Sequence, residues 1–294
     1  MKYIIYLITY SFLWCISILP FPLLYLFSDF VYLLMYRVIG YRKKTVRANI
    51  KLAFPEYTEK EVIAVEKAFY KHLCDMFLEM IKTMTISAEE LDRRYQFKNI
   101  EIVKEYEKKG KSIILMCSHY ASWEWVIALG KYLATDGYGV YKKIANPHFD
   151  TLVRGIRSRF NARLIDTKHT VATVKQNEAK GIHATYLFIS DQTPRPRRGT
   201  YWSKFMGQET PIHTGAEKLA KDLDMAVLYI NVTKVKRGFY EAEFSEITDN
   251  PLKEPEYAIT EKFLRIVEQQ IKADPRYYFW THKRWKHKQK KGAE

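Results

Sequence analysis

The pattern of apolar and polar residues divides the chain into an N-terminal helical part and an alternating remainder. Between residues 56 and 84, apolar side chains such as Val62, Val65, Phe69 and Leu73 recur at steps of three and four, which predicts an amphipathic helix. Further along, short apolar runs typical of strands alternate with segments of helical periodicity. We expect strands at residues 112–117, 138–144, 162–165, 184–189, 226–233 and 239–247, and helices at residues 123–134, 148–160, 170–179, 214–223 and 256–273. This alternation predicts an α/β fold with a mixed sheet flanked by helices.

The first 28 residues predict a membrane anchor. Residues 3–28 carry no charged side chain and exceed the roughly 20 residues that span a bilayer core. Only Lys2 precedes this segment, whereas six Lys and Arg residues lie between residues 37 and 51, so the positive-inside rule places the body of the protein in the cytoplasm. Pro20 and Pro22 leave an alternative, in which the helix breaks and residues 21–36 lie in the membrane interface as a second element.

Composition limits the class of protein and its partners. No linker rich in Gly, Ser or Pro divides the 294 residues, so we expect an anchor at residues 1–36 and one large domain at residues 37–294. Cys15, Cys74 and Cys117 are few, odd in number and far apart, which argues against a disulfide framework. The net charge of +15 favours an anionic partner such as a lipid surface. Nucleic acid is the rival partner, but the chain contains no nucleic-acid-binding motif, and such a protein would not need the apolar N-terminus.

A histidine and a glutamate follow the apolar run at residues 112–117. His119 and Glu124 are five positions apart, which on one helix would separate them by roughly 140°. A loop at His119 and a helix that begins near Ser122 would instead let the side chains meet. A carboxylate on one ring nitrogen fixes the tautomer of a histidine, whose other nitrogen then acts as a general base. Spacing alone also fits a structural pair, and Cys117 fits a core position better than a nucleophile.

Three blocks of sequence together resemble the bacterial late acyltransferases of lipid A biosynthesis, in the lysophospholipid acyltransferase-like superfamily. The blocks are His-Tyr-Ala-Ser-Trp-Glu at residues 119–124, Asp191-Gln192 after a second apolar run, and Tyr-Phe-Trp-Thr-His-Lys-Arg-Trp-Lys at residues 278–286. The resemblance implies an acyltransferase domain on the cytoplasmic face of the inner membrane, with His119 as base and Glu124 holding it. It also implies an acyl carrier protein thioester as donor, with acyl-CoA as the alternative, and an acylated, phosphorylated glucosamine disaccharide as acceptor.

Basic residues near these blocks are candidates for substrate binding. The resemblance implies an arginine that helps to hold the acceptor or the oxyanion, and Arg157 is our choice, although a solvated helix face explains it equally. Arg197 and Arg198 lie in a proline-stiffened loop, and arginine forks match phosphate oxygens, so we expect them to contact phosphate or the carrier. Asp191 is expected to hold this loop and contribute to substrate binding. The histidines lack metal-ligand spacing, so we expect neither a metal nor a cofactor.

Two other functions are compatible with these residues. The same pair of side chains could acylate a lysophospholipid or a lysoaminolipid in place of a lipid A precursor. A protein of another class, a catalytically silent membrane lipid-binding protein, would share the anchor and the positive charge. Only the products formed from a panel of acceptors separate these readings.

Overall fold

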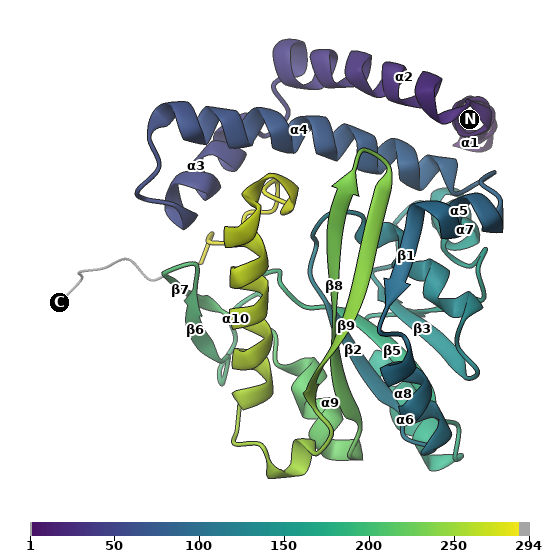
Figure 1. Ribbon diagram of the computed structural model, residues 1–294, viewed down its shortest axis with the longest axis vertical. Helices are drawn as coiled ribbons and strands as arrows, with labels where there is room; N and C mark the ends of the chain where they lie inside the picture. The colour runs from purple at the N-terminus through teal and green to yellow at the C-terminus, as the bar shows by residue number, and fades with distance from the viewer. Residues whose placement is uncertain (1, 288–294) are drawn as a thin grey trace.

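A seven-stranded mixed sheet forms the centre of the molecule (Figure 1). The computed structural model describes residues 2–287. The strand order is β1-β9-β8-β2-β5-β3-β4, and every neighbouring pair is parallel except the antiparallel β8 and β9. The strands are β1 (Tyr95–Lys98), β2 (Ile113–Cys117), β3 (Asp136–Tyr141), β4 (Ala162–Asp166), β5 (Ala184–Ile189), β8 (Ala226–Lys236) and β9 (Phe239–Thr248), with a separate hairpin of β6 (Trp202–Phe205) and β7 (Gln208–Pro211). The predicted fold class is confirmed.

Helices cover both the faces and one end of this sheet. The helical elements are α1 (Lys2–Ile18), α2 (Phe21–Leu33), η1 (Leu34–Ile39), α3 (Lys43–Ala53), α4 (Glu59–Lys82), α5 (Ala88–Arg94), α6 (Glu101–Lys108), η2 (Trp123–Lys131), α7 (Pro147–Arg157), α8 (Thr170–Ala179), α9 (Gly215–Leu223), η3 (Pro251–Lys253), α10 (Ala258–Ala273) and η4 (Pro275–Tyr277). The long helix α4 lies across the end of the sheet where β8 turns into β9, and α2 lies on its outer side (Figure 1).

The central strand β2 fixes the geometry of the site. All five of its residues are buried, because it has a strand on each side and helices over both faces. Leu115 pairs with Leu187 of β5 and with Leu228 of β8, and all three strands run in the same direction. Residues that follow β2 and β5 therefore emerge side by side at one edge of the sheet, where parallel sheets collect functional side chains.

The N-terminal apolar segment is two helices and not one. The chain leaves α1 at Ile18 and enters α2 at Phe21, so a single helix over residues 3–28 is not formed. The break falls at Pro20, whose ring removes a backbone donor and cannot continue a helix from the preceding turn. This matches the alternative with a second element. The segment Phe21–Ile39, which joins α2 and η1, has 19 residues and a mean hydropathy of 1.4, long and apolar enough to cross a membrane.

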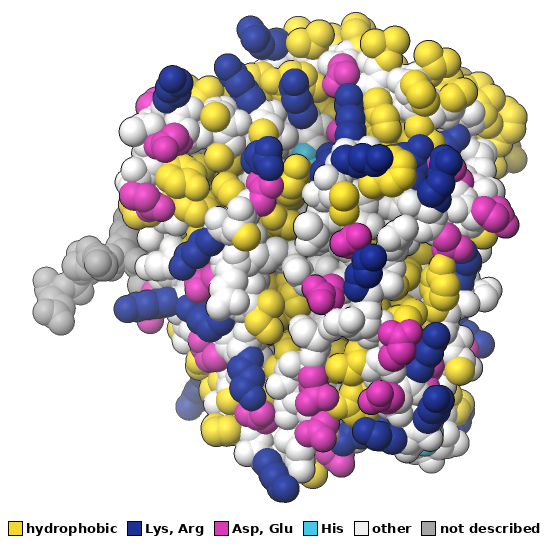
Figure 2. Space-filling view, in the orientation of Figure 1, with side chains coloured by type: hydrophobic (Ala, Val, Ile, Leu, Met, Phe, Trp, Pro, Cys, Tyr) yellow, Lys and Arg dark blue, Asp and Glu magenta, His cyan; other side chains and the backbone are white. Residues whose placement is uncertain are grey.

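Polar contacts tie α2 to α4 while its other face stays apolar. Ser28 donates to Asp75, and Tyr25 donates to the fully buried Glu79. Away from α4, α1 and α2 expose large apolar side chains, among them Ile4, Ile8, Phe12, Leu23, Leu26 and Phe30. Hydrophobic side chains cover the upper edge of the molecule where these two helices lie (Figure 2). Large exposed apolar surfaces of this kind are typical of sites that bind a membrane or another protein.

Candidate active site

His119 and Asp191 occupy equivalent positions on neighbouring strands. Cys117 and Ile189 are the last residues of β2 and β5 and are paired in register, and each site residue lies two positions further on. His119 Nδ1 is 2.6 Å from Asp191 Oδ1, and the backbone N–H of His119 donates to the same oxygen at 3.1 Å. The Asp191 side chain is 1% exposed and the His119 ring 19% exposed. The imidazole is thus held from inside the protein with its outer edge accessible.

Asp191, and not Glu124, is the carboxylate that orients His119. Ala121 adopts a left-handed conformation with φ of +48°, and the chain then enters η2 at Trp123. This turn brings the Trp123 ring to 5.3 Å from that of His119 and leaves Glu124 on another side of the helix. The expected bond between His119 and Glu124 is therefore wrong. Asp191, which we expected to hold the following loop and to contribute to substrate binding, forms a hydrogen bond to the His119 ring that the sequence did not predict.

Glu124 instead forms a bidentate ion pair with Arg157. Arg157 Nε donates to Oε2 at 3.0 Å and Nη2 donates to Oε1 at 2.6 Å. The two side chains are 11% and 26% exposed, and the nearby Glu124 charge raises the pKa of Arg157 against the lowering effect of burial. Because Arg157 ends α7 and Glu124 begins η2, the pair fastens these elements to each other. Arg157 is therefore not a solvated helix residue.

The bond to Asp191 decides which ring nitrogen of His119 can accept a proton. A carboxylate accepts from Nδ1–H, so Nε2 carries the free lone pair. The side-chain amide of Gln192 lies 3.3 Å from Nε2. Burial alone would raise the pKa of Asp191, but the His119 charge and the hydrogen bonds from its ring and backbone outweigh burial and lower that pKa. The lowered pKa favours the anionic form of Asp191 beside the His119 ring.

The C-terminal block of sequence forms a wall of the same site. The N–H of Ala121 donates to Tyr277 O at 3.0 Å, and the N–H of Phe279 donates to His119 O at 3.0 Å. The Phe279 ring stacks over the His119 ring at 5.9 Å. Asn49 of α3 secures this wall, because its side chain donates to two carbonyl groups of residues 280–282. The terminal block thus covers the loop that carries His119.

A model of bacterial lipid A biosynthesis acyltransferases matches residues 1–287 of this chain. The chain belongs to this family. Among curated relatives, the Escherichia coli lipid A biosynthesis lauroyltransferase is 24% identical over 278 residues, which cover 93% of this chain and 89% of the relative. A Haemophilus influenzae lipid A biosynthesis acyltransferase is 25% identical over 275 residues, covering 91% and 86%. The Escherichia coli lipid A biosynthesis myristoyltransferase is 23% identical over 150 residues, half of this chain. The protein is an acyltransferase.

The acyltransferase site includes polar residues that the sequence did not single out. His282 Nε2 accepts from the N–H of Thr193 at 3.4 Å, and burial lowers the pKa of His282 to about 4, so this ring stays neutral. Arg284 is 1% exposed and donates from Nη1 to Thr210 at 2.9 Å. Both lie in the terminal block on which the resemblance rests, and that block was the signal that could have identified them.

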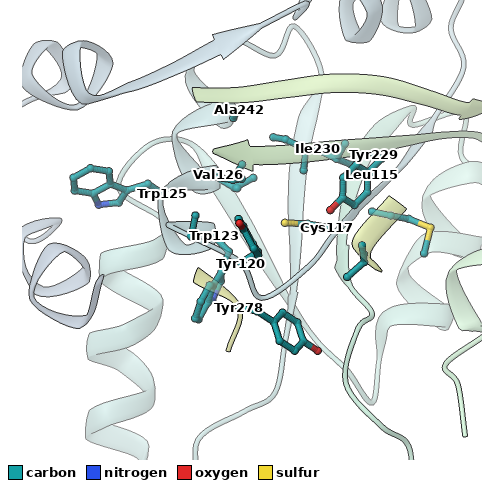
Figure 3. Packing of buried hydrophobic residues seen from close by; sticks show 14 of the residues in the cluster. Leu115, Cys117, Tyr120, Trp123, Trp125, Val126, Tyr229, Ile230, Ala242 and Tyr278 are labelled. Atoms are coloured by element: carbon teal, nitrogen blue, oxygen red, sulfur yellow. The ribbon is translucent and has the colours of Figure 1, made fainter. Parts of the chain in front are cut away.

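Cys117 is buried, whereas the basic loop is exposed to solvent. Cys117 is 1% exposed and packs among the core residues of the acyltransferase (Figure 3), where burial raises the pKa of its thiol. A buried thiol of this kind is a core residue and a poor nucleophile, as expected. Arg197 and Arg198 are exposed, in the loop that begins at Asp191. The N–H of Arg197 donates to Thr200 Oγ1 at 2.7 Å, which shapes the loop and leaves both guanidinium groups toward solvent.

Proposed function

We propose that this acyltransferase moves a fatty acyl chain from an acyl carrier protein thioester to a hydroxyl of a lipid A precursor on the cytoplasmic face of the inner membrane. The family match supports the acylation of lipid A precursors. The observation that carries the mechanism is the buried Asp191 on Nδ1 of a partly exposed His119. This arrangement gives a general base of fixed tautomer at the edge of the sheet.

In the proposed reaction, Nε2 of His119 removes the proton from the acceptor hydroxyl as its oxygen attacks the thioester carbonyl carbon. Asp191 stabilises the imidazolium that forms. The tetrahedral intermediate then collapses, the carbon–sulfur bond breaks, and the imidazolium returns its proton to the departing thiolate. The new ester and the free carrier thiol leave, and His119 is neutral again. Gln192 lies at the position that the acceptor hydroxyl would take beside Nε2.

Glu124 and Arg157 are proposed to act together near the reacting carbonyl. Glu124 occupies Nε and Nη2 of Arg157, so the pair carries little net charge and holds η2 in position. Since Trp123 of η2 contacts His119, this ion pair positions the wall of the site. Nη1 of Arg157 is the donor that remains for the oxyanion or the acceptor. A single preorganised donor of this kind contributes roughly 3 kcal/mol to transition-state stabilisation.

The anchor and the basic loop are proposed to deliver the two substrates. The exposed apolar faces of α1 and α2 would lie against or within the bilayer, where the lipid acceptor resides. The division into an anchor at residues 1–36 and an acyltransferase domain at residues 37–294 follows from this role. Arg197 and Arg198 would meet the acidic carrier or an acceptor phosphate, because both present free guanidinium groups on an exposed loop.

A panel of acceptors and donors tests this function. The purified full-length protein in neutral detergent is incubated with lipid A precursors, lysophospholipids or lysoaminolipids, each with acyl carrier protein or CoA thioesters. We expect mass spectrometry to detect an added acyl chain on the lipid A precursor with the carrier thioester, and no addition by His119→Ala. Faster acylation of a lysolipid would assign the alternative acceptor. Lipid binding without acylation of any acceptor would refute catalysis and favour a binding protein.

A further inference from the structure

An open cavity with several charged side chains in its lining lies beneath α2, outside the site described above. It has a volume of about 550 Å³ and is bounded by α2, α4, the turn between β8 and β9, and η4. Its lining contains four cationic side chains, Lys71, Lys234, Arg237 and Arg276. In Figure 2, Lys and Arg side chains gather in the part of the surface where α4 and the β8–β9 turn meet. A cavity of this size accommodates a lipid headgroup.

The cations of this cavity outnumber its carboxylates. Asp29 and Asp75 are the acidic residues of the lining, and both accept hydrogen bonds from the Arg237 guanidinium at distances from 2.7 to 3.1 Å. Lys234 is 3.6 Å from Asp75. Lys71 is exposed and has no carboxylate within ion-pair distance in residues 2–287. The lining therefore has an excess of two positive charges.

Two further contacts affect this excess. Arg276 is paired with Asp274, which lies outside the lining and offsets part of the Arg276 charge. His72 Nδ1 lies 3.2 Å from Lys234 Nζ, and burial together with the Lys234 charge holds the pKa of His72 well below its usual range. His72 is thus a neutral acceptor that orients Lys234. With Asp274 counted, the excess is one positive charge, which favours an anionic group such as phosphate.

The location of the cavity points to a lipid as the source of this phosphate. Tyr32 and Leu33 of α2, within the apolar segment Phe21–Ile39, form part of its lining. Lys234 and Arg237 are carried to the same place because β8 continues beyond the end of its pairing with β2 at Tyr229. The cavity therefore lies next to the apolar segment that is proposed to contact the membrane, which favours a lipid as its ligand.

One residue links this cavity to the catalytic loop. Tyr277 lines the cavity, its ring lies 4.8 Å from that of His72, and its carbonyl oxygen accepts from the N–H of Ala121. Ala121 and His119 belong to the same loop. We propose that the cavity bounded by Lys71, Lys234, Arg237 and Arg276 binds the phosphate group of an anionic lipid. The inference rests on the proposed function only where that lipid is taken to be the acceptor.

Lys71 is the residue with which to test the proposal, because it is exposed and free of ion pairs that hold the fold. Lys60 is the matched control: it is also exposed on α4, and eleven residues along a helix place it on the same side about 16 Å away. Binding of water-soluble dihexanoyl phosphatidic acid to the full-length protein in neutral detergent is measured by calorimetry, with dihexanoyl phosphatidylcholine as the comparison lipid. We expect Lys71→Glu to weaken phosphatidic acid binding at least tenfold and Lys60→Glu to leave it unchanged.

Equal phosphatidic acid affinity in Lys71→Glu and the wild type, or no binding by the wild type, overturns the proposal. Steady-state kinetics then identify the source of the phosphate. A KM that rises in Lys71→Glu for a phosphorylated acceptor, but not for the same acceptor after phosphatase treatment, assigns the site to the acceptor. An unchanged KM with weakened phosphatidic acid binding assigns it to a membrane phospholipid. Repeating the calorimetry on His119→Ala separates the phosphate-binding proposal from the proposed acyl transfer, because phosphate binding in the cavity does not depend on turnover.

Discussion

Replacing Asp191 by Asn tests the central claim about the site, that this carboxylate orients the base. Asp191 Oδ1 accepts two hydrogen bonds, from the backbone N–H and from Nδ1 of His119. Because one oxygen accepts both bonds, an asparagine that places its carbonyl oxygen there preserves them but carries no negative charge, so the imidazolium loses its anionic partner. An asparagine that places its NH₂ group there loses the backbone bond and makes Nδ1 the acceptor, so the ring proton lies on Nε2 and blocks removal of the acceptor proton.

The expected loss is large because either orientation of the asparagine removes the charge that stabilises the imidazolium. A general base contributes about 10²–10⁴-fold to a rate. We expect kcat for Asp191→Asn to fall at least ~10³-fold, which corresponds to about 4 kcal/mol in the activation free energy. Because Asn fills the same buried volume, KM for both substrates and the thermal unfolding temperature should change little.

Turnover is followed by the thiol released from the carrier thioester and confirmed by mass spectrometry of the acylated lipid. Circular dichroism and membrane sedimentation provide the controls for folding and attachment. A kcat for Asp191→Asn within tenfold of the wild type would refute the assignment of Asp191, because the negative charge would then not matter for the chemical step. His119→Ala sets the baseline, and it should lose nearly all turnover.

Four further results are expected. Glu124→Gln weakens the bidentate ion pair with Arg157 of α7 and should lower kcat by about 10²-fold by displacing η2, with KM nearly unchanged; an unaltered kcat contradicts this positioning role. Replacing Arg197 and Arg198 with Glu should raise KM at low salt, with a smaller effect at 1 M salt, where the Debye length falls to about 3 Å; equal KM values at every salt concentration would return both to a solvated surface. Leu26→Glu, on the exposed face of α2, should increase the fraction released from membranes by carbonate, and unchanged sedimentation would argue against that face as the anchor. His282 has a pKa of about 4 in the folded protein against about 6.5 when unfolded, so the unfolded state binds more protons between these two values. The free energy of unfolding should therefore fall as pH drops from about 6.5 to about 4, and chemical denaturation of His282→Gln should show a weaker pH dependence.

Six of the seven strands of the sheet could be predicted, because most of them are short apolar runs between helical segments. β2 and β5 were expected within a residue of their bounds in the structure. The four-residue strand β1 was not predicted, nor were several short elements with few apolar residues, among them the basic helix α3 and the hairpin of β6 and β7. Their positions depend on tertiary contacts, such as the bonds from Asn49 to the C-terminal wall, which a local pattern does not contain.

The partners of the site residues could not be predicted from spacing. His119 and Glu124 are close in sequence, but the left-handed turn at Ala121 separates their side chains, and nothing in a run of residues fixes that backbone angle. Asp191 lies 72 positions from His119 and reaches it only because β5 is the neighbour of β2. Strand order is a property of the whole sheet. The sequence thus identified the residues of the site, while the pairing among them required the topology.

The positions of the base and the proposed phosphate cavity restrict the acceptor. His119 and the cavity lie at the same edge of the sheet, with Tyr277 and the loop around Ala121 between them. If one lipid occupies both, its phosphate and its reacting hydroxyl must be far enough apart to pass around Tyr277. A lysophosphatidic acid carries its phosphate and hydroxyl on neighbouring carbons of one glycerol, whereas a phosphorylated disaccharide separates these groups by at least part of a sugar unit. A Lys71-dependent KM for the acceptor would therefore favour the glycolipid over the lysophospholipid.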